Sequence, residues 1–153
     1  MATVKSDIYL KQNGEQVGNP KAEIGDVNGR IRSLYFSYTF AADVLSIADI
    51  VKLGQLPKGA RIVGGKFYSD SLGTTGIMTV GWPASADAVE AADTNGIFAA
   101  IDAGGQAVVA DAVSTDGFGK KFAAKVDVQA VFTEASDAAN GDSIKGVIEY
   151  VID

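Results

Sequence analysis

The chain has 153 residues, 47% of them hydrophobic, and its 13 basic and 19 acidic side chains give a formal net charge of −6. This length and apolar content suit one folded domain and argue against wholesale disorder. Histidine and cysteine are both absent, which excludes Ser-His-Asp and Cys-His nucleophiles, zinc and iron–sulfur sites built on these side chains, and disulfides.

The charge is unevenly distributed along the chain. Residues 1–69 carry nine basic and six acidic side chains, whereas residues 70–153 carry four and thirteen. Nucleic acid requires clustered basic residues, so no nucleic-acid partner is expected. The N-terminal segment lacks the apolar core of a signal peptide, and no apolar run reaches the roughly 20 residues that cross a bilayer. The sequence therefore predicts a soluble protein made in the cytoplasm, without a membrane partner.

Residues 1–29 are predicted to form an N-terminal strand followed by an extended arm. Val4, Ile8 and Leu10 fall on one face of a period-two pattern, which is typical of a strand. The polar, turn-rich residues 11–29 then read as an extended connection to the core.

Period-two alternation predicts most of the remaining elements. Residues 44–53 also suit a short helix, but their β-branched side chains and the Pro-Gly turn beyond them favour a strand. The clearest alternation is in residues 121–133, where six alternate positions from Phe122 to Phe132 are apolar. The predicted strands are residues 33–40, 44–53, 60–69, 76–82, 121–133 and 143–153.

The stretch KLGQLPKGARIVGG, residues 52–65, has the glycine spacing of a phosphate-binding loop at Gly54 and Gly59. Such a loop continues with Lys and Ser or Thr, whereas here Ala60 and Arg61 follow. Pro57 and Gly59 instead suit the second and fourth positions of a type I turn. A structural turn is therefore predicted at Leu56, Pro57, Gly59 and Ala60.

Residues 83–117 are rich in Ala, Asp and Gly and contain no lysine or arginine. Residues 84–93 and 96–103 are each predicted to form one or two helical turns, and residues 104–119 a loop with one short strand. Asn-Gly pairs, including residues 95–96 and 140–141, can supply the positive φ of tight turns. We expect an excursion from a β core rather than a second domain.

Two groups of residues suit either a ligand site or a structural role. Asp93, Asn95 and Asp102 could offer oxygen ligands to Ca²⁺, but the loop lacks the glycine and glutamate positions of an EF-hand. Trp82 and the tyrosines could stack on a sugar, although large aromatics in a β-sandwich more often lie in the core or at an interface. No pair of carboxylates is marked out for catalysis. The sequence therefore predicts no enzyme, no metal and no cofactor.

The frequent short strands and turns indicate an all-β protein, a jelly-roll-like antiparallel β-sandwich with an extended N-terminal arm and a loop/short-helix excursion. In this prediction residues 1–29 are the N-terminal strand and arm. Residues 30–153 form a single sandwich domain, with the excursion at 83–117.

Residues 44–102 contain an LPxGA turn, a D-x-LG segment, a glycine-bounded strand and a following acidic or Asn-Gly segment with a Phe expected to be buried. The residues of these motifs are Leu56, Pro57, Gly59, Ala60, Asp70, Leu72, Gly73, Gly81 and Phe98. With these motifs the segment resembles small structural proteins of tailed bacteriophages, in particular cement or head-decoration proteins.

This resemblance implies a virion structural protein on the capsid exterior, synthesised in the bacterial host cytoplasm. Its implied partners are the phage major capsid protein, whose subunits it would bridge, and itself, as a homo-oligomer and most often a trimer. An arm carrying Val4, Ile8 and Leu10 would suit strand addition to a neighbour's sheet edge. Two alternatives stay open at this point: another virion component (a tail-tube, neck or fibre subunit) and a carbohydrate-binding β-sandwich.

Overall fold

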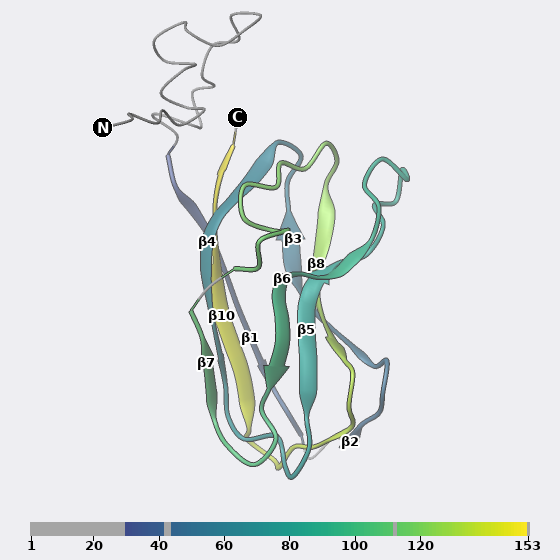
Figure 1. Cartoon of the computed structure of the whole chain (residues 1–153), viewed down its shortest axis with the longest axis vertical. Coiled ribbons are helices and arrows are strands. Elements are labelled where there is room, and N and C mark those ends of the chain that lie inside the picture. Colours follow the sequence, from purple (N-terminus) through teal and green to yellow (C-terminus); the bar gives the residue numbers. More distant parts are fainter. Residues whose placement is uncertain (1–29, 42–43, 112, 153) are drawn as a thin grey trace, which may run out of the picture.

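The computed structural model describes residues 30–41, 44–111 and 113–152, and every regular element in these ranges is a β-strand. Two four-stranded antiparallel sheets lie face to face as the layers of a sandwich (Figure 1). The strands are β1 Arg32–Thr39, β2 Val44–Leu45, β3 Ile50–Leu56, β4 Ala60–Ser69, β5 Ile77–Trp82, β6 Asp93–Asp102, β7 Val108–Ala110, β8 Val126–Phe132, β9 Ser136–Asp137 and β10 Ser143–Ile152. None of the described residues belongs to a helix long and apolar enough to cross a membrane.

The topology is that of a jelly roll. One sheet has the order β1-β10-β4-β7 and the other β3-β8-β5-β6, while β2 and β9 form a separate two-stranded ribbon. In the two main sheets the outermost strands in sequence pair first: β1 with β10, then β3 with β8, β4 with β7 and β5 with β6. This nested pairing corresponds to one long antiparallel hairpin rolled into two sheets. The predicted jelly-roll-like sandwich is therefore confirmed.

Four of the predicted strands, at residues 33–40, 60–69, 76–82 and 143–153, are confirmed as β1, β4, β5 and β10. Their alternation places one set of side chains between the sheets, because successive strand residues point to opposite faces. In β1, for example, Phe36 is buried and its neighbour Tyr35 is exposed.

Aromatic side chains join the two layers in the middle of the sandwich. The ring of Phe67 lies 5.9 Å from that of Phe36 in its own sheet and 5.9 Å from that of Phe98 in the opposite sheet. Phe40 and Phe132 meet edge to face at 6.4 Å. Such rings contribute large buried areas, so they dominate the packing energy of this core.

The strand predicted at residues 44–53 is divided into β2 and β3 by a tight turn. The backbone N–H of Asp49 donates to the carbonyl of Ser46 at 3.1 Å, and the Asp49 carboxylate accepts the Ser46 N–H at 2.7 Å. Ala48 has a φ of 72°. The preference for strand over helix is confirmed, but a single continuous strand is wrong, because an aspartate-capped turn is stable at this position.

The strand predicted at residues 121–133 begins only at Val126, as β8. The preceding Phe122 pairs with the opposite sheet instead: its N–H donates to Ala60 at 2.9 Å, and its carbonyl accepts the Gly59 N–H at 2.8 Å. The six predicted inward positions are all buried. The alternation therefore predicted the buried face correctly, but it could not reveal that the chain changes sheets along its length.

The helical turns predicted at residues 96–103 are wrong, because this segment lies in β6. Phe98 is opposite Val80 and Ile101 is opposite Met78, so two residues, Ala99 and Ala100, lie opposite the single residue between Met78 and Val80. This β-bulge, with a φ of 49° at Ala100, brings Phe98 and Ile101 to the same face at a spacing of three. A spacing of three between apolar residues is also the helical signal.

The other predictions within 83–117 have mixed outcomes. Residues 84–93 form no helix: residues 84–92 belong to the β5–β6 connection and Asp93 begins β6. Within the connection the Ala88 N–H donates to the carbonyl of Ser85 at 2.9 Å. The short strand predicted in 104–119 is confirmed as β7. The Asn-Gly turn at 140–141 is confirmed by a φ of 99° at Gly141, but residues 95–96 lie inside β6.

Candidate functional site

The β3–β4 connection contains the residues predicted as a structural turn. Leu56 ends β3 and Ala60 begins β4, and both are fully buried. The N–H of Ala60 donates to the carbonyl of Pro57 at 3.1 Å, and Gly59 has a φ of 82°. A positive φ at the third position is what a type II turn requires. The closing hydrogen bond thus lies one residue beyond the type I turn expected from Pro57, and the turn carries the chain from one sheet to the other.

The glycine amides near this turn contact the protein itself. Gly59 N–H donates to the carbonyl of Phe122, and Gly119 N–H donates to the carbonyl of Ile62, both at 2.8 Å. Ile62 N–H in turn donates to Lys120 at 3.1 Å. A phosphate-binding loop must leave such amides directed at its ligand. These amides instead join the segment before β8 to the start of β4.

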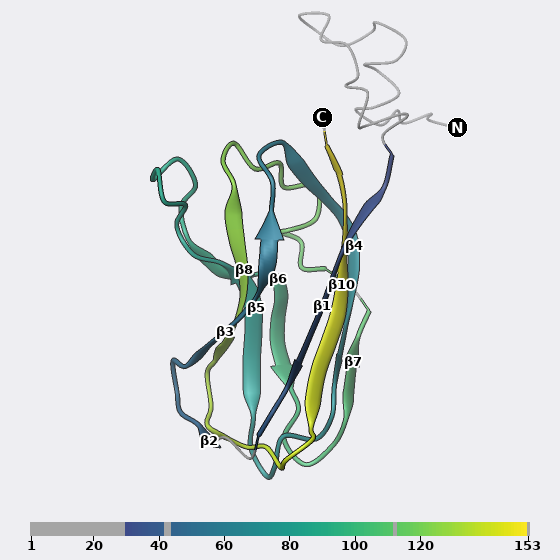
Figure 2. The same ribbon diagram turned by 180° about the vertical axis from the view of Figure 1, so that it is seen from behind.

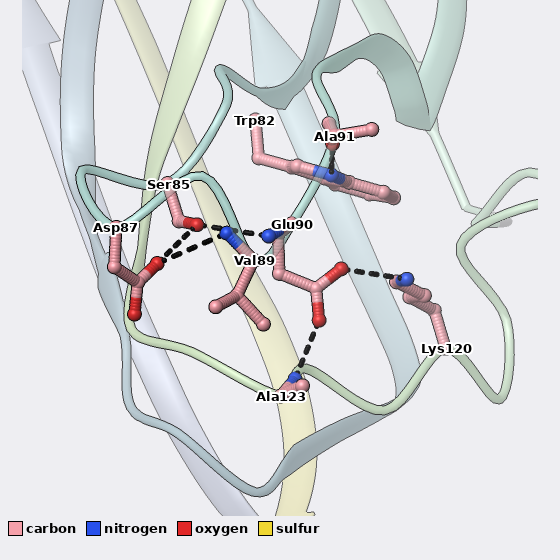
Figure 3. Close-up of polar contacts among 8 residues, drawn as sticks. All are labelled: Trp82, Ser85, Asp87, Val89, Glu90, Ala91, Lys120 and Ala123. Atoms are coloured by element: carbon pink, nitrogen blue, oxygen red, sulfur yellow. Dashed lines mark hydrogen bonds and ion pairs between the residues drawn. The ribbon is translucent and has the colours of Figure 1, made fainter.

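The carboxylate of Glu90 ties the β5–β6 connection to the same segment (Figure 3). Its side chain is only 6% exposed, and Lys120 Nζ lies 2.8 Å from Oε2. The other carboxylate oxygen accepts the N–H of Ala123. Within the β5–β6 connection itself, the Ser85 hydroxyl accepts the Glu90 N–H at 2.9 Å, and the Ser85 N–H donates to the Glu90 carbonyl at 3.0 Å.

Glu90 is held as an anion. Burial raises the pKa of its carboxyl, but the hydrogen bond from Lys120, the N–H of Ala123 and the charge of Lys120 together bring that pKa below its ordinary value. A general acid or base requires a pKa close to the working pH. The Glu90 carboxylate is therefore suited to fastening two connections together. Sequence analysis missed this pair, because nothing in the spacing of Glu90 and Lys120 signals that they meet.

Trp82 belongs to this fastened region and is only 3% exposed. Its indole Nε1 donates to the carbonyl of Ala91 at 3.0 Å, and its ring meets Phe122 edge to face at 4.9 Å. Stacking on a sugar requires an accessible ring face, so the hypothesis of a sugar platform at Trp82 is wrong.

Three acidic residues of 83–117 accept hydrogen bonds from nearby residues in turns and connections. Asp87 accepts the hydroxyl of Ser85 at 2.6 Å, Asp93 accepts the N–H of Asn95 at 3.3 Å, and Asp102 accepts the N–H of Gly104 at 3.0 Å. Short acidic side chains commonly satisfy backbone donors in this way. Within residues 30–41, 44–111 and 113–152, no three acidic side chains converge to hold a metal ion.

Several large apolar side chains lie on the surface. Tyr35, Tyr68 and Val109 are 77%, 44% and 57% exposed on the β1-β10-β4-β7 sheet. Others lie near the ends of the sandwich: Ile31, Ile47, Val89 and Phe118. Exposed apolar side chains gathered on one surface indicate a binding role. Val4, Ile8 and Leu10, the predicted partner-binding arm, lie outside the described residues.

The fold and these contacts define a jelly-roll β-sandwich. Glu90 joins its β5–β6 connection to the segment before β8, and its β1-β10-β4-β7 sheet exposes several large apolar side chains. No family model matches the chain, and no curated protein matches its sequence.

Among solved structures, the chain is similar to a chain of the capsid of Ralstonia phage GP4, with 24% identity and a TM-score of 0.67 over 89% of this chain and 93% of that one. It is also similar to a chain of the cyanophage Pam1 capsid asymmetric unit, with 20% identity and a TM-score of 0.64 over 88% and 91% of the two chains. At these identities the likeness establishes a shared fold over almost the full length of each chain.

Proposed function

We propose that the chain is a virion structural protein of a tailed bacteriophage: a cement or decoration protein that binds the outer surface of the head and bridges neighbouring major capsid subunits. The observation that carries this proposal is the fold shared over 89% and 88% of the chain with chains from two phage capsids. The turn motifs in residues 44–102 support it independently, because that resemblance rests on the amino-acid sequence alone.

The physical role is multivalent clamping by a non-enzymatic protein. A copy that contacts several capsid subunits needs only a modest interface with each, because linked contacts raise the overall avidity. A protein that binds assembled subunits but not dissociated ones stabilises the assembly by mass action. The contacts of Glu90 with Lys120 and Ala123 suit this role, because connections that are held in place before binding lose little conformational freedom on binding.

The proposal is tested with the full chain and phage heads that lack it. Purified protein should cosediment with the heads and raise the temperature at which they fall apart, and a cryo-EM map should show its density on the outside of the shell. Density in the tail, neck or fibres would assign it to another virion component. Absence of binding to any part of the particle would overturn the proposal.

The arm has its own test within this function. Residues 1–29 would add a strand, with Val4, Ile8 and Leu10 on one face, to a sheet edge of a neighbouring subunit. Deleting residues 1–20 should then weaken binding to heads while the unfolding temperature of the sandwich stays unchanged. Undiminished binding would remove the arm from the proposal and leave the clamping role in place.

A further inference from the structure

Two exposed tyrosines, Tyr35 and Tyr68, lie on the outer face of the β1-β10-β4-β7 sheet. Figure 2 shows its four strands side by side. Tyr35 on β1 is in register with Val147 on β10 and Lys66 on β4. One row further along, Lys145 on β10, Tyr68 on β4 and Val109 on β7 are in register. We call this surface the tyrosine face: Tyr35, Lys66, Tyr68, Val109, Lys145 and Val147.

The composition of the tyrosine face is that of an interface. Tyrosine is enriched at protein–protein contacts, and it supplies a large contact area at a small entropy cost. The other sheet has a different outer surface, where Lys52 pairs with Asp127 at 3.0 Å and Gln55 donates to the same carboxylate at 2.8 Å. The polar groups of that surface therefore form hydrogen bonds and an ion pair with one another.

The charge of the tyrosine face indicates what binds there. Lys66 and Lys145 lie near three carboxylates: Asp111, 3.5 Å from Lys66, Glu149, exposed on β10, and Asp70, which lines the pocket beside Lys145. Two cations against three carboxylates leave this surface nearly balanced in charge, in a protein whose net charge is −6. Two identical acidic molecules repel each other through most of their surfaces, but less through a nearly balanced one.

A projecting side chain and a pocket lie at opposite borders of this face. Tyr35 is 77% exposed at the β1 border, whereas a pocket of about 210 Å³ opens at the β7 border, between Tyr68, Val109 and Lys145. The 31 residues of the four strands, of 8, 10, 10 and 3 residues, span roughly 500 Å² at the ordinary strand spacings. This is about two thirds of the roughly 800 Å² that each partner contributes to a standard interface.

We propose that the occupant of the tyrosine face is a second copy of this chain, with Tyr35 of one copy seated in the pocket beside Tyr68 of another. This rests on the proposed function, whose family resemblance implies a homo-oligomer, and it names the surface through which the copies meet.

Sedimentation velocity of the full-length protein tests the proposal without any capsid. At about 10 μM, where micromolar contacts form, the wild-type protein should be oligomeric. Tyr35→Ser and Tyr68→Ser should each weaken self-association at least about tenfold. Ile50→Ser is the matched control, because Ile50 is 52% exposed on an edge strand of the other sheet, and it should associate like the wild type.

A second measurement uses the absence of cysteine from the chain. Tyr35→Cys combined with Val109→Cys should form disulfide-linked oligomers on oxidation, whereas Ile50→Cys should not. A monomeric wild type, full association of Tyr35→Ser, equal loss with Ile50→Ser, or no cross-linking of the double variant would each overturn the proposal. Because no capsid is present, these outcomes are separate from failure to bind heads.

Discussion

The carboxylate of Glu90 lies between two connections that are distant in sequence, and it has a charged donor on one side and a backbone donor on the other. Removing it leaves the ammonium of Lys120 and the N–H of Ala123 without this partner. Lys120 is 34% exposed and Ala123 is exposed, so both donors can turn to water, and the cost is that of two charge-assisted hydrogen bonds and of the packing of a buried side chain.

Glu90→Ala is therefore expected to lower the free energy of unfolding by about 1–3 kcal/mol. Urea denaturation followed by fluorescence measures this directly, because Trp82 is the only tryptophan and lies in the same region. Glu134→Ala, at an exposed position, is the control and should change stability by less than about 0.5 kcal/mol. Equal effects of the two substitutions would contradict the role given to Glu90.

Four carboxyl groups, including that of Glu90, should make the stability of the protein depend on pH. The pKa of Glu90 is lowered in the folded state, as are those of Asp70 by Ser143, Asp87 by Ser85 and Asp127 by Lys52. A lowered folded-state pKa stabilises the protein above the ordinary carboxyl pKa, and this contribution is lost as the pH falls through the folded-state value. The ordinary values are 3.8 for Asp and 4.5 for Glu.

Stability should thus be retained above about pH 5 and fall steadily below about pH 4. Urea midpoints measured from neutral to acidic pH provide the test, and Glu90→Gln should show a shallower decline than the wild type. A midpoint that rises on acidification would contradict the assignment.

At the scale of elements, the bulge in β6 determines which side chains of that strand reach the core. Deleting both Ala99 and Ala100 would make Phe98 and Ile101 consecutive, so that their side chains would point to opposite faces. Ile101, now buried, would turn to solvent, and we expect a loss of about 2–4 kcal/mol of stability.

Ala100→Gly is the matched control for this deletion. It keeps the bulge and relieves the positive φ of 49°, so stability should be unchanged or rise by up to about 1 kcal/mol. Both variants are compared by urea denaturation. A double deletion of Ala99 and Ala100 that is as stable as the wild type would show that the spacing of Phe98 and Ile101 does not set the register.

The elements also explain which sequence predictions were correct. Alternation was sufficient to locate β1, β4, β5 and β10, because each of these strands has one face in the core, although it could not reveal the register shift between β10 and β4 at Glu149 and Tyr150. It was misleading for β6, where the bulge mimics helical spacing, and for the start of β8, where Phe122 pairs with Ala60 in the other sheet. The pairing of Glu90 with Lys120 depends on two long-range loop contacts, which a local pattern does not contain.

At the scale of the whole molecule, net charge and the tyrosine face make a prediction about salt. Copies that each carry −6 repel at long range, and the Debye length shortens to about 8 Å at physiological ionic strength. Raising sodium chloride from about 10 mM to about 150 mM should therefore strengthen self-association, or leave it unchanged, in sedimentation experiments. Marked weakening would indicate that ion pairs, rather than apolar contacts, hold the copies together.

The nested pairing of strands has a consequence for how the protein is made. β10 lies between β1 and β4, so the first strand of this sheet waits for residues 143–152 to leave the ribosome before its partner exists. Contacts between such distant segments close slowly, because the loop entropy is lost before the pairing is gained. During synthesis β1 and β4 both present open edges, the kind of surface on which nascent chains associate wrongly. Production of this protein should therefore depend on the rate of chain release and on chaperones, more than its final stability would suggest.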